Sequence, residues 1–176
     1  MSFVEALEQG LMWACEDYTK IASGWLGSDV KPKEDQIKCA LYAAFRAAEY
    51  HVHVEPSHES DTRCDLIVKQ GNGSHVGVEI KTAWAATNWM VKPSEQERNW
   101  KYDIEKLKML IKDDSIKKGY LIVLLASEKD SPAEKKLRDM IQTLPACRKS
   151  RVGPVPITPW NGLDMLQFFV VTVKPA

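Results

Sequence analysis

Two acids and a lysine lie close to the ends of a predicted β-hairpin. Asp65 comes directly before one short apolar run, and Glu79 and Lys81 lie at the end of the next. The Gly-Asn-Gly turn at 71–73 separates the two runs, and these residue types favour a tight hairpin connection. Antiparallel pairing of the runs would bring Asp65 and Glu79 to the same end of the hairpin.

The chemistry expected of these side chains is the binding of a divalent cation next to a phosphate. Glu79 and Lys81 are two residues apart on a strand, so they point to one face, while Ile80 points to the core. Carboxylate oxygens suit Mg²⁺, which needs only one or two of them together with water and a phosphate. The alternative is an ordinary exposed strand face on which Glu79 and Lys81 form a salt bridge.

The local context of Glu79 and Lys81 carries more information than the acid-X-Lys tripeptide itself. About one or two such tripeptides are expected by chance in a chain of this length and charge content. The sequence has three, at 29–31, 79–81 and 134–136. Only the tripeptide at 79–81 lies at the end of an apolar run. That run follows the turn of the predicted hairpin, and Asp65 precedes the run before the turn.

Asp65, followed after thirteen residues by Glu79-Ile80-Lys81, resembles the PD-(D/E)XK nuclease superfamily, the restriction-endonuclease-like proteins. The resemblance extends from about residue 31 to residue 126. One departure is Cys64, which stands where that family often has a proline before the aspartate.

The resemblance implies an α/β fold with a mixed central sheet and helices on both faces. It also implies a Mg²⁺-dependent endonuclease, with Mn²⁺ as an alternative ion, that hydrolyses phosphodiester bonds in DNA rather than RNA. Asp65, Glu79 and the backbone carbonyl of Ile80 would hold the ion, and Lys81 would orient the attacking water. A homodimer would be in keeping with the duplex-cleaving members of this superfamily.

A predicted helix places a further acid near this site. Pro32 suits its first turn, and one apolar stripe follows at helical spacing, made of Ile37, Ala40, Leu41, Ala44, Phe45 and Ala48. Glu34 falls on the same stripe. In the resembling family a glutamate on this helix joins the metal site, and Glu34 matches it. Glu34 could instead stabilise the helix dipole and turn to solvent, and Glu49 is a weaker candidate for the metal site.

The remaining pattern predicts alternating helices and strands. The segments are a helix from Phe3 to about Trp25, a loop at 23–28, a strand at 50–56, a helix from Pro93, a buried strand at 119–126, a helix at 131–144, a basic and proline-rich loop at 148–159 and a strand at 168–173. Residues 1–27 could form an N-terminal helical extension of a single domain spanning 1–176.

The predicted helix from Pro93 carries both apolar and basic side chains. Its apolar stripe is expected to consist of Tyr102, Leu107, Leu110 and Ile111. Lys106 is a candidate to face the site, since the resembling family often places a polar residue there. Trp84, Trp89 and Trp100 could stack on bases, although such rings more often cover a core edge.

Composition favours a water-soluble globular domain. Of 176 residues, 44% are hydrophobic and 27% charged, and no apolar run approaches the roughly 20 residues of a membrane span. Glu5 and Glu8 stand where a secretory signal would be basic, so we expect a cytoplasmic protein without a membrane partner. The four cysteines show no Cys-X-X-Cys spacing.

The charge distribution is compatible with a nucleic-acid partner. Residues 1–88 hold 8 basic and 13 acidic side chains, whereas residues 89–176 hold 16 and 11. An acidic half could hold metal and a basic half could hold phosphates. The alternative function is a catalytically inactive nuclease-fold protein that binds nucleic acid or another protein.

Overall fold

The computed structural model describes residues 1–20, 34–55, 64–85, 93–145, 148–160 and 163–174. Along these residues the elements are α1 (Phe3–Lys20), α2 (Glu34–Ala47), β1 (His51–Val54), β2 (Leu66–Lys69), β3 (His75–Ala85), α3 (Pro93–Lys112), β4 (Lys118–Ser127), α4 (Pro132–Thr143), β5 (Arg148–Trp160) and β6 (Leu163–Val173). The strands form one six-stranded sheet in the order β1-β2-β3-β4-β6-β5. β3 and β4 pair in parallel and the other neighbours are antiparallel, which confirms the predicted mixed α/β sheet.

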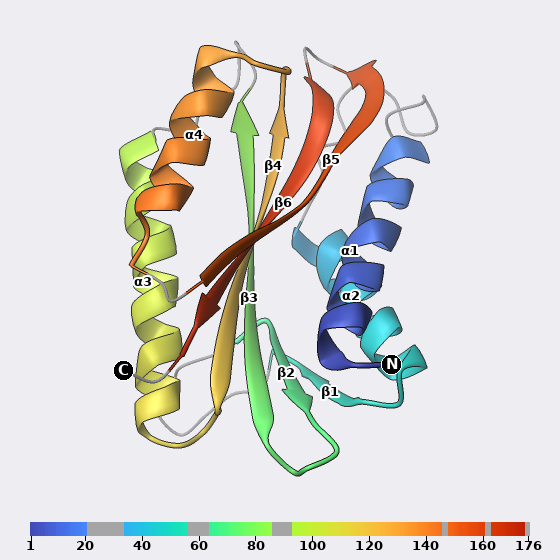
Figure 1. The fold of residues 1–176 in the computed structure, drawn as a ribbon, viewed down its shortest axis with the longest axis vertical. Helices are drawn as coiled ribbons and strands as arrows, with labels where there is room; N and C mark the ends of the chain where they lie inside the picture. The colour runs from blue at the N-terminus through green and yellow to red at the C-terminus, as the bar shows by residue number, and fades with distance from the viewer. Residues whose placement is uncertain (21–33, 56–63, 86–92, 146–147, 161–162, 175–176) are drawn as a thin grey trace.

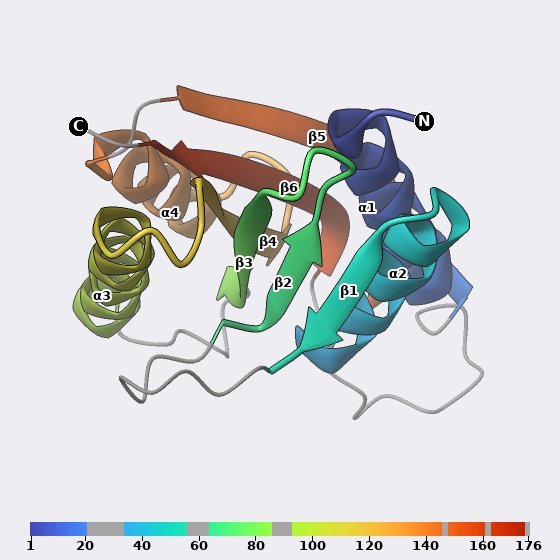
Figure 2. The ribbon, with the colours of Figure 1, turned by 90° about the horizontal axis from the view of Figure 1, so that it is seen from below.

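Helices cover both faces of this sheet. Figures 1 and 2 show α1 and α2 on one side and α3 and α4 on the other. β4 lies between the two cores and is buried from Gly119 to Ser127, so the continuous apolar run predicted for a central strand is confirmed. Its side chains alternate between the two cores, with Leu124 in the α1/α2 core and Leu125 in the α3/α4 core. No helix in the described part of the chain is both long and apolar enough to cross a membrane.

α1 and α2 pack closely on each other and on the sheet. The apolar stripe predicted for α2 is buried from Ile37 to Phe45. A Cβ atom added at Gly10 of α1 would lie 2.9 Å from Leu41 Cδ2 and 3.0 Å from Leu41 Cα, so only glycine allows this approach. The predicted first helix is confirmed as far as Lys20, and its continuation, the loop at 23–28 and Pro32 lie outside the described residues.

β2 and β3 form the predicted hairpin. Leu66 pairs with Val78 and Lys69 with His75, and Gly73 in the turn has a φ of 83°, which glycine adopts readily. β3 continues well beyond the predicted run because its parallel pairing with β4 extends to Ala85. Residues 82–85 have no clean strand period, so the partner strand determines their conformation.

The apolar stripe predicted for α3 is confirmed at Leu107, Leu110 and Ile111 and wrong at Tyr102. Tyr102 is 66% exposed, and the stripe continues toward the start of the helix through Ile104 and Trp100, which are buried. The core interpretation of Trp100 is therefore confirmed. The side chains of Trp84 and Trp89 lie outside the described residues.

The loop predicted at 148–159 is also wrong, because β5 occupies Arg148–Trp160. β5 is an edge strand that pairs with β6 alone, and its register shifts twice, between Val152 and Val155 and between Pro156 and Trp160. Edge strands and bulges tolerate proline because the N–H that proline lacks is not needed there for a hydrogen bond to a neighbouring strand.

Filling the Gly10 contact should destabilise the fold. We expect Gly10→Val to lower the free energy of unfolding by about 1–3 kcal/mol, because the added methyl groups must push α1 away from Leu41. Urea unfolding followed by circular dichroism measures the change. The control Gln9→Val alters an exposed neighbouring position and should cost much less; equal losses in both variants would contradict the proposed close contact.

Candidate active site

The candidate site lies where β3 loses its β2 partner. The β2–β3 ladder ends at Leu66 and Val78, so the following N–H groups on that edge of β3 need other acceptors. The N–H of Ile80 donates to Asp65 Oδ2 at 2.7 Å, and the N–H of Thr82 donates to Glu34 Oε1 at 3.2 Å. Two predicted site acids, one from the hairpin and one from α2, therefore lie along the same strand edge.

Glu79 and Lys81 project from β3 toward α3. Lys106 Nζ lies 2.7 Å from Glu79 Oε1, and Lys81 Nζ lies 3.7 Å from Asp103 Oδ2. Lys106 Nζ also lies 3.5 Å from Asp103 Oδ1. These contacts follow from the opposite directions of β3 and α3, which Figure 1 shows side by side. The result is a chain of alternating charges that runs from Glu79 through Lys106 and Asp103 to Lys81.

Lys38 of α2 holds Asp65 from the other side. Its ammonium lies 3.3 Å from Asp65 Oδ1 and donates to Glu55 Oε1 at 2.5 Å. Glu55 directly follows β1 and has a left-handed φ of 46°. Since Asp65 Oδ2 accepts from the N–H of Ile80, both carboxylate oxygens of Asp65 have a partner. The aspartate is therefore held in a fixed orientation at the strand edge.

Burial dominates the electrostatics of the acids. Glu79 is only 2% exposed, and this burial raises the pKa of its carboxyl to about 7, against the opposing charge of Lys106. Burial also raises the pKa of Glu34 and of Asp103, and Lys81 opposes both shifts. Asp65 contributes to raising all three pKa values, so the four acids lie within electrostatic reach of one another.

The two buried lysines stay charged. Burial alone would lower the pKa of Lys106, but its hydrogen bond to Glu79 and the charges of Glu79 and Asp103 raise it above the ordinary value. The same balance holds for Lys38, whose pKa is raised by Glu55 and Asp65. Each ammonium therefore neutralises an acid that would otherwise be buried with an uncompensated charge.

The donor set fits Mg²⁺ in chemistry. Among the described residues no three His, Cys, Asp or Glu side chains gather as a metal site. Asp65, Glu79 and the Ile80 carbonyl form a different set of two carboxylates and one strand carbonyl, which suffices for an ion that keeps several waters. The Ile80 carbonyl faces the same edge as its N–H, because both groups of a strand residue point to one side. Asp103 Oδ2 is buried and accepts no hydrogen bond in the described structure, and its ion pair with Lys81 at 3.7 Å supplies the compensating charge.

The structure brings the predicted site residues together. Asp65 and Glu34 lie at this edge of β3, where they accept from the N–H groups of Ile80 and Thr82, and the side chains of Glu79 and Lys81 lie beside it on the sheet face toward α3. The alternative Glu49 is exposed at the far end of α2 and takes no part in these contacts.

The other acid-X-Lys tripeptides do not share this setting. Glu134 and Lys136 lie on α4, where Glu134 is buried against Arg138 and Lys136 is exposed. The tripeptide at 29–31 lies outside the described residues. In the described chain, the strand context therefore separates the tripeptide at 79–81 from the one on α4.

Sequence reasoning missed Lys38 and Asp103. Asp103 lies between Trp100 and Ile104 on the buried side of α3, so a predicted stripe that included these two residues would have revealed it. Lys38 follows the buried Ile37, and its partner Glu55 is too distant in sequence for a local pattern to connect them.

Comparisons with known proteins place the chain in no family. No protein-family model matches the sequence, and no curated protein matches it. A solved structure that matches is the crystal structure of SSO0001, with a TM-score of 0.34 and 15% sequence identity over 79% of this chain and 74% of that chain. A likeness at that TM-score carries no argument about function.

The buried Glu79 should give the stability of the protein a distinct pH dependence. Because its pKa rises from an ordinary 4.5 to about 7 on folding, the folded state binds the extra proton between these values. Stability should therefore be highest near the acid end of this window and fall as pH rises from 4.5 to 7, by roughly 1–3 kcal/mol from this group.

Chemical unfolding in EDTA-containing buffers between pH 4.5 and 8 measures this slope. Glu79→Gln should flatten it without abolishing it, because Glu34 and Asp103 shift in the same direction. The exposed control Glu128→Gln should keep the wild-type slope. If Glu79→Gln also kept it, another group would be responsible.

Proposed function

We propose that the chain is a restriction-endonuclease-like, metal-dependent nuclease that hydrolyses phosphodiester bonds, most naturally in DNA. The observation that carries this proposal is that Asp65 binds the edge of β3 that β2 leaves unpaired, at Ile80, between Glu79 and Lys81 of the same strand. The mixed sheet with helices on both faces is compatible with such a fold.

The binding of the ion would fall to three groups. Asp65 is already oriented by Lys38 and by the N–H of Ile80, so its carboxylate needs little reorganisation. Glu79 and the Ile80 carbonyl supply the other oxygens from adjacent positions of one rigid strand. A bound Mg²⁺ would stabilise charge on the phosphate and lower the pKa of a water molecule.

Lys81 would orient the attacking water and counter the negative charge that develops on the phosphate. Its ammonium lies 3.7 Å from Asp103 Oδ2, which positions it on the α3 side of the edge. Glu34, held by the N–H of Thr82, is placed to bind a further water or ion at the same edge.

A second candidate function is a catalytically inactive nuclease fold that binds nucleic acid or a protein partner. The observation that favours it is that Lys38 and Lys106 already neutralise Asp65 and Glu79. If these ion pairs are permanent, the same residues stabilise the fold and perform no chemistry.

Cleavage assays distinguish the two functions. Supercoiled plasmid and a single-stranded oligonucleotide are incubated with Mg²⁺, Mn²⁺ or EDTA. We expect nicking with either ion and none in EDTA. Asp65→Asn, Glu79→Gln and Lys81→Ala should each lower the rate by about 100-fold or more, the scale for loss of a positioned catalytic group.

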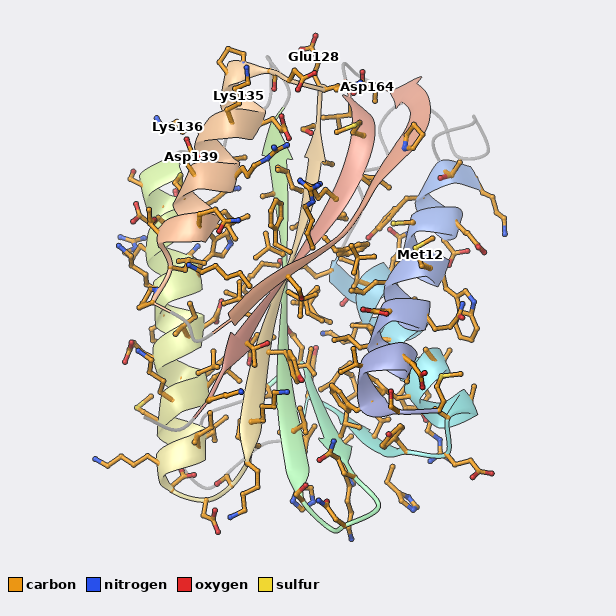
Figure 3. All side chains as sticks on the ribbon, viewed as in Figure 1. Met12, Glu128, Lys135, Lys136, Asp139 and Asp164 are labelled. Atoms are coloured by element: carbon orange, nitrogen blue, oxygen red, sulfur yellow. The ribbon has the colours of Figure 1, made fainter. Side chains whose placement is uncertain are left out.

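The controls are matched substitutions outside the site contacts described above. Asp139→Asn, Glu128→Gln and Lys136→Ala make the same chemical changes at exposed positions on and next to α4 (Figure 3). These variants should cleave like the wild type. Binding to DNA without any metal-dependent nicking would favour the inactive fold, and full activity in any of the three site variants would contradict the proposed assignment.

A further inference from the structure

Lys106 occupies an unusual place for a lysine. Its side chain is 12% exposed, and its ammonium lies between two buried carboxylates, at 2.7 Å from Glu79 Oε1 and 3.5 Å from Asp103 Oδ1. Most of the lysines on α3 point outward, such as Lys108, which pairs with Glu105 at the surface. Lys106 is thus the group that compensates Glu79 when no cation is present.

The same carboxylate is needed for the ion in the proposed function. Glu79 Oε1 cannot keep a close ammonium partner and also bind a divalent cation at full strength, since the two positive charges would repel at short range. A cation that binds Glu79 therefore competes with Lys106 for the charge of this carboxylate. The displaced ammonium has a second acceptor within reach, because Asp103 lies one helical turn before it on α3.

We propose that Lys106 is an internal competitor of the metal ion, which pairs with Glu79 in the metal-free protein and moves to Asp103 when a divalent cation binds. This inference rests on the proposed function and adds a form of regulation to the same site. The affinity for the metal ion would then depend on Lys106 and Asp103 of α3 as well as on the two acids of the hairpin.

The exchange also reaches Lys81. Asp103 is the ion-pair partner of Lys81 through Oδ2, and its other oxygen lies near Lys106. When Lys106 moves to Asp103, it neutralises that carboxylate and weakens its attraction for Lys81. Cation binding at Glu79 would then release Lys81 toward the substrate side of the edge, which couples metal occupancy to the availability of the lysine.

Calorimetric titration of the full chain with Mg²⁺ alone, without nucleic acid, tests the competition. At pH 8.5, above the pKa of about 7 of Glu79, we expect Lys106→Met to lower the Kd for Mg²⁺ by about tenfold, the equivalent of one hydrogen bond between charged groups. Lys106→Gln keeps the length and polarity of the side chain and should act in the same direction if the methionine variant folds poorly. The surface control Lys108→Met should leave the Kd unchanged.

A double-mutant cycle tests the move to Asp103. In the wild-type background, Asp103→Asn removes the negative charge of the second partner and should weaken Mg²⁺ binding by about threefold or more, within the range of couplings between contacting residues. In the Lys106→Gln background the same substitution should have little effect. A purely long-range charge effect of Asp103 would weaken binding equally in both backgrounds and would contradict the exchange.

These outcomes separate the inference from the proposed function. If the wild type binds Mg²⁺ and nicks DNA but Lys106→Met and Lys106→Gln bind the ion no more tightly, the competition is refuted and the nuclease proposal stands. If neither the wild type nor these variants bind Mg²⁺, both proposals fail.

Discussion

The structure around the candidate site depends on one constraint, which is that the Glu79 carboxylate is buried and must be neutralised. A buried charge without a partner costs several kcal/mol, so the protein has to place a cation next to it. That cation comes from α3, as Lys106. The position of α3 is set in turn by Trp100, Ile104 and Leu107, which are buried against the sheet. The packing of one helix therefore determines the charge state of an acid on a neighbouring strand.

A difference in strand length produces the rest of the site. β2 is short and β3 is long, so β3 has an edge where backbone N–H groups need acceptors other than β2. Asp65 and Glu34 supply them, and the hydrogen bonds that satisfy the backbone also hold both carboxylates at the edge. The same hydrogen bonds satisfy the backbone of β3 and position the two acids, which explains how Glu34 and Asp65, 31 positions apart in sequence, come to lie along one strand edge.

The ion pairs around the site could serve only to stabilise the fold, or they could give way when a cation binds. The two possibilities differ in whether Lys38 and Lys106 can change partners. Lys38 and Lys106 complete a set of ion pairs that is self-sufficient without a ligand. Lys38 also contacts Glu55, so it is tied to the chain between α2 and β2. Lys106 has Asp103 as an alternative partner on its own helix, one turn away. Lys38 has a comparable neighbour in Asp35 at 3.7 Å on α2, but the Asp35 side chain is 80% exposed, whereas that of Asp103 is 6% exposed. The exchange of partners is therefore proposed for Glu79 and not for Asp65.

Local patterns in the sequence determined much of the fold. The Gly-Asn-Gly turn and its flanking runs specified the hairpin, the apolar stripe of α2 specified its buried face, and Ser131 with Pro132 marked the start of α4. The hairpin also determined that Asp65, Glu79 and Lys81 would meet, because register and strand alternation follow from the turn. The sequence also indicated that Lys106 would face the site and that Leu107 and Leu110 would be buried. Only the tertiary structure decided that 148–160 forms an edge strand, that Trp100 and Ile104 and not Tyr102 complete the buried stripe of α3, and that Lys38 and Asp103 join the charge network. The reason is that these features depend on contacts between segments far apart in sequence, and neither β5 nor α3 carries a local pattern strong enough to specify its neighbours.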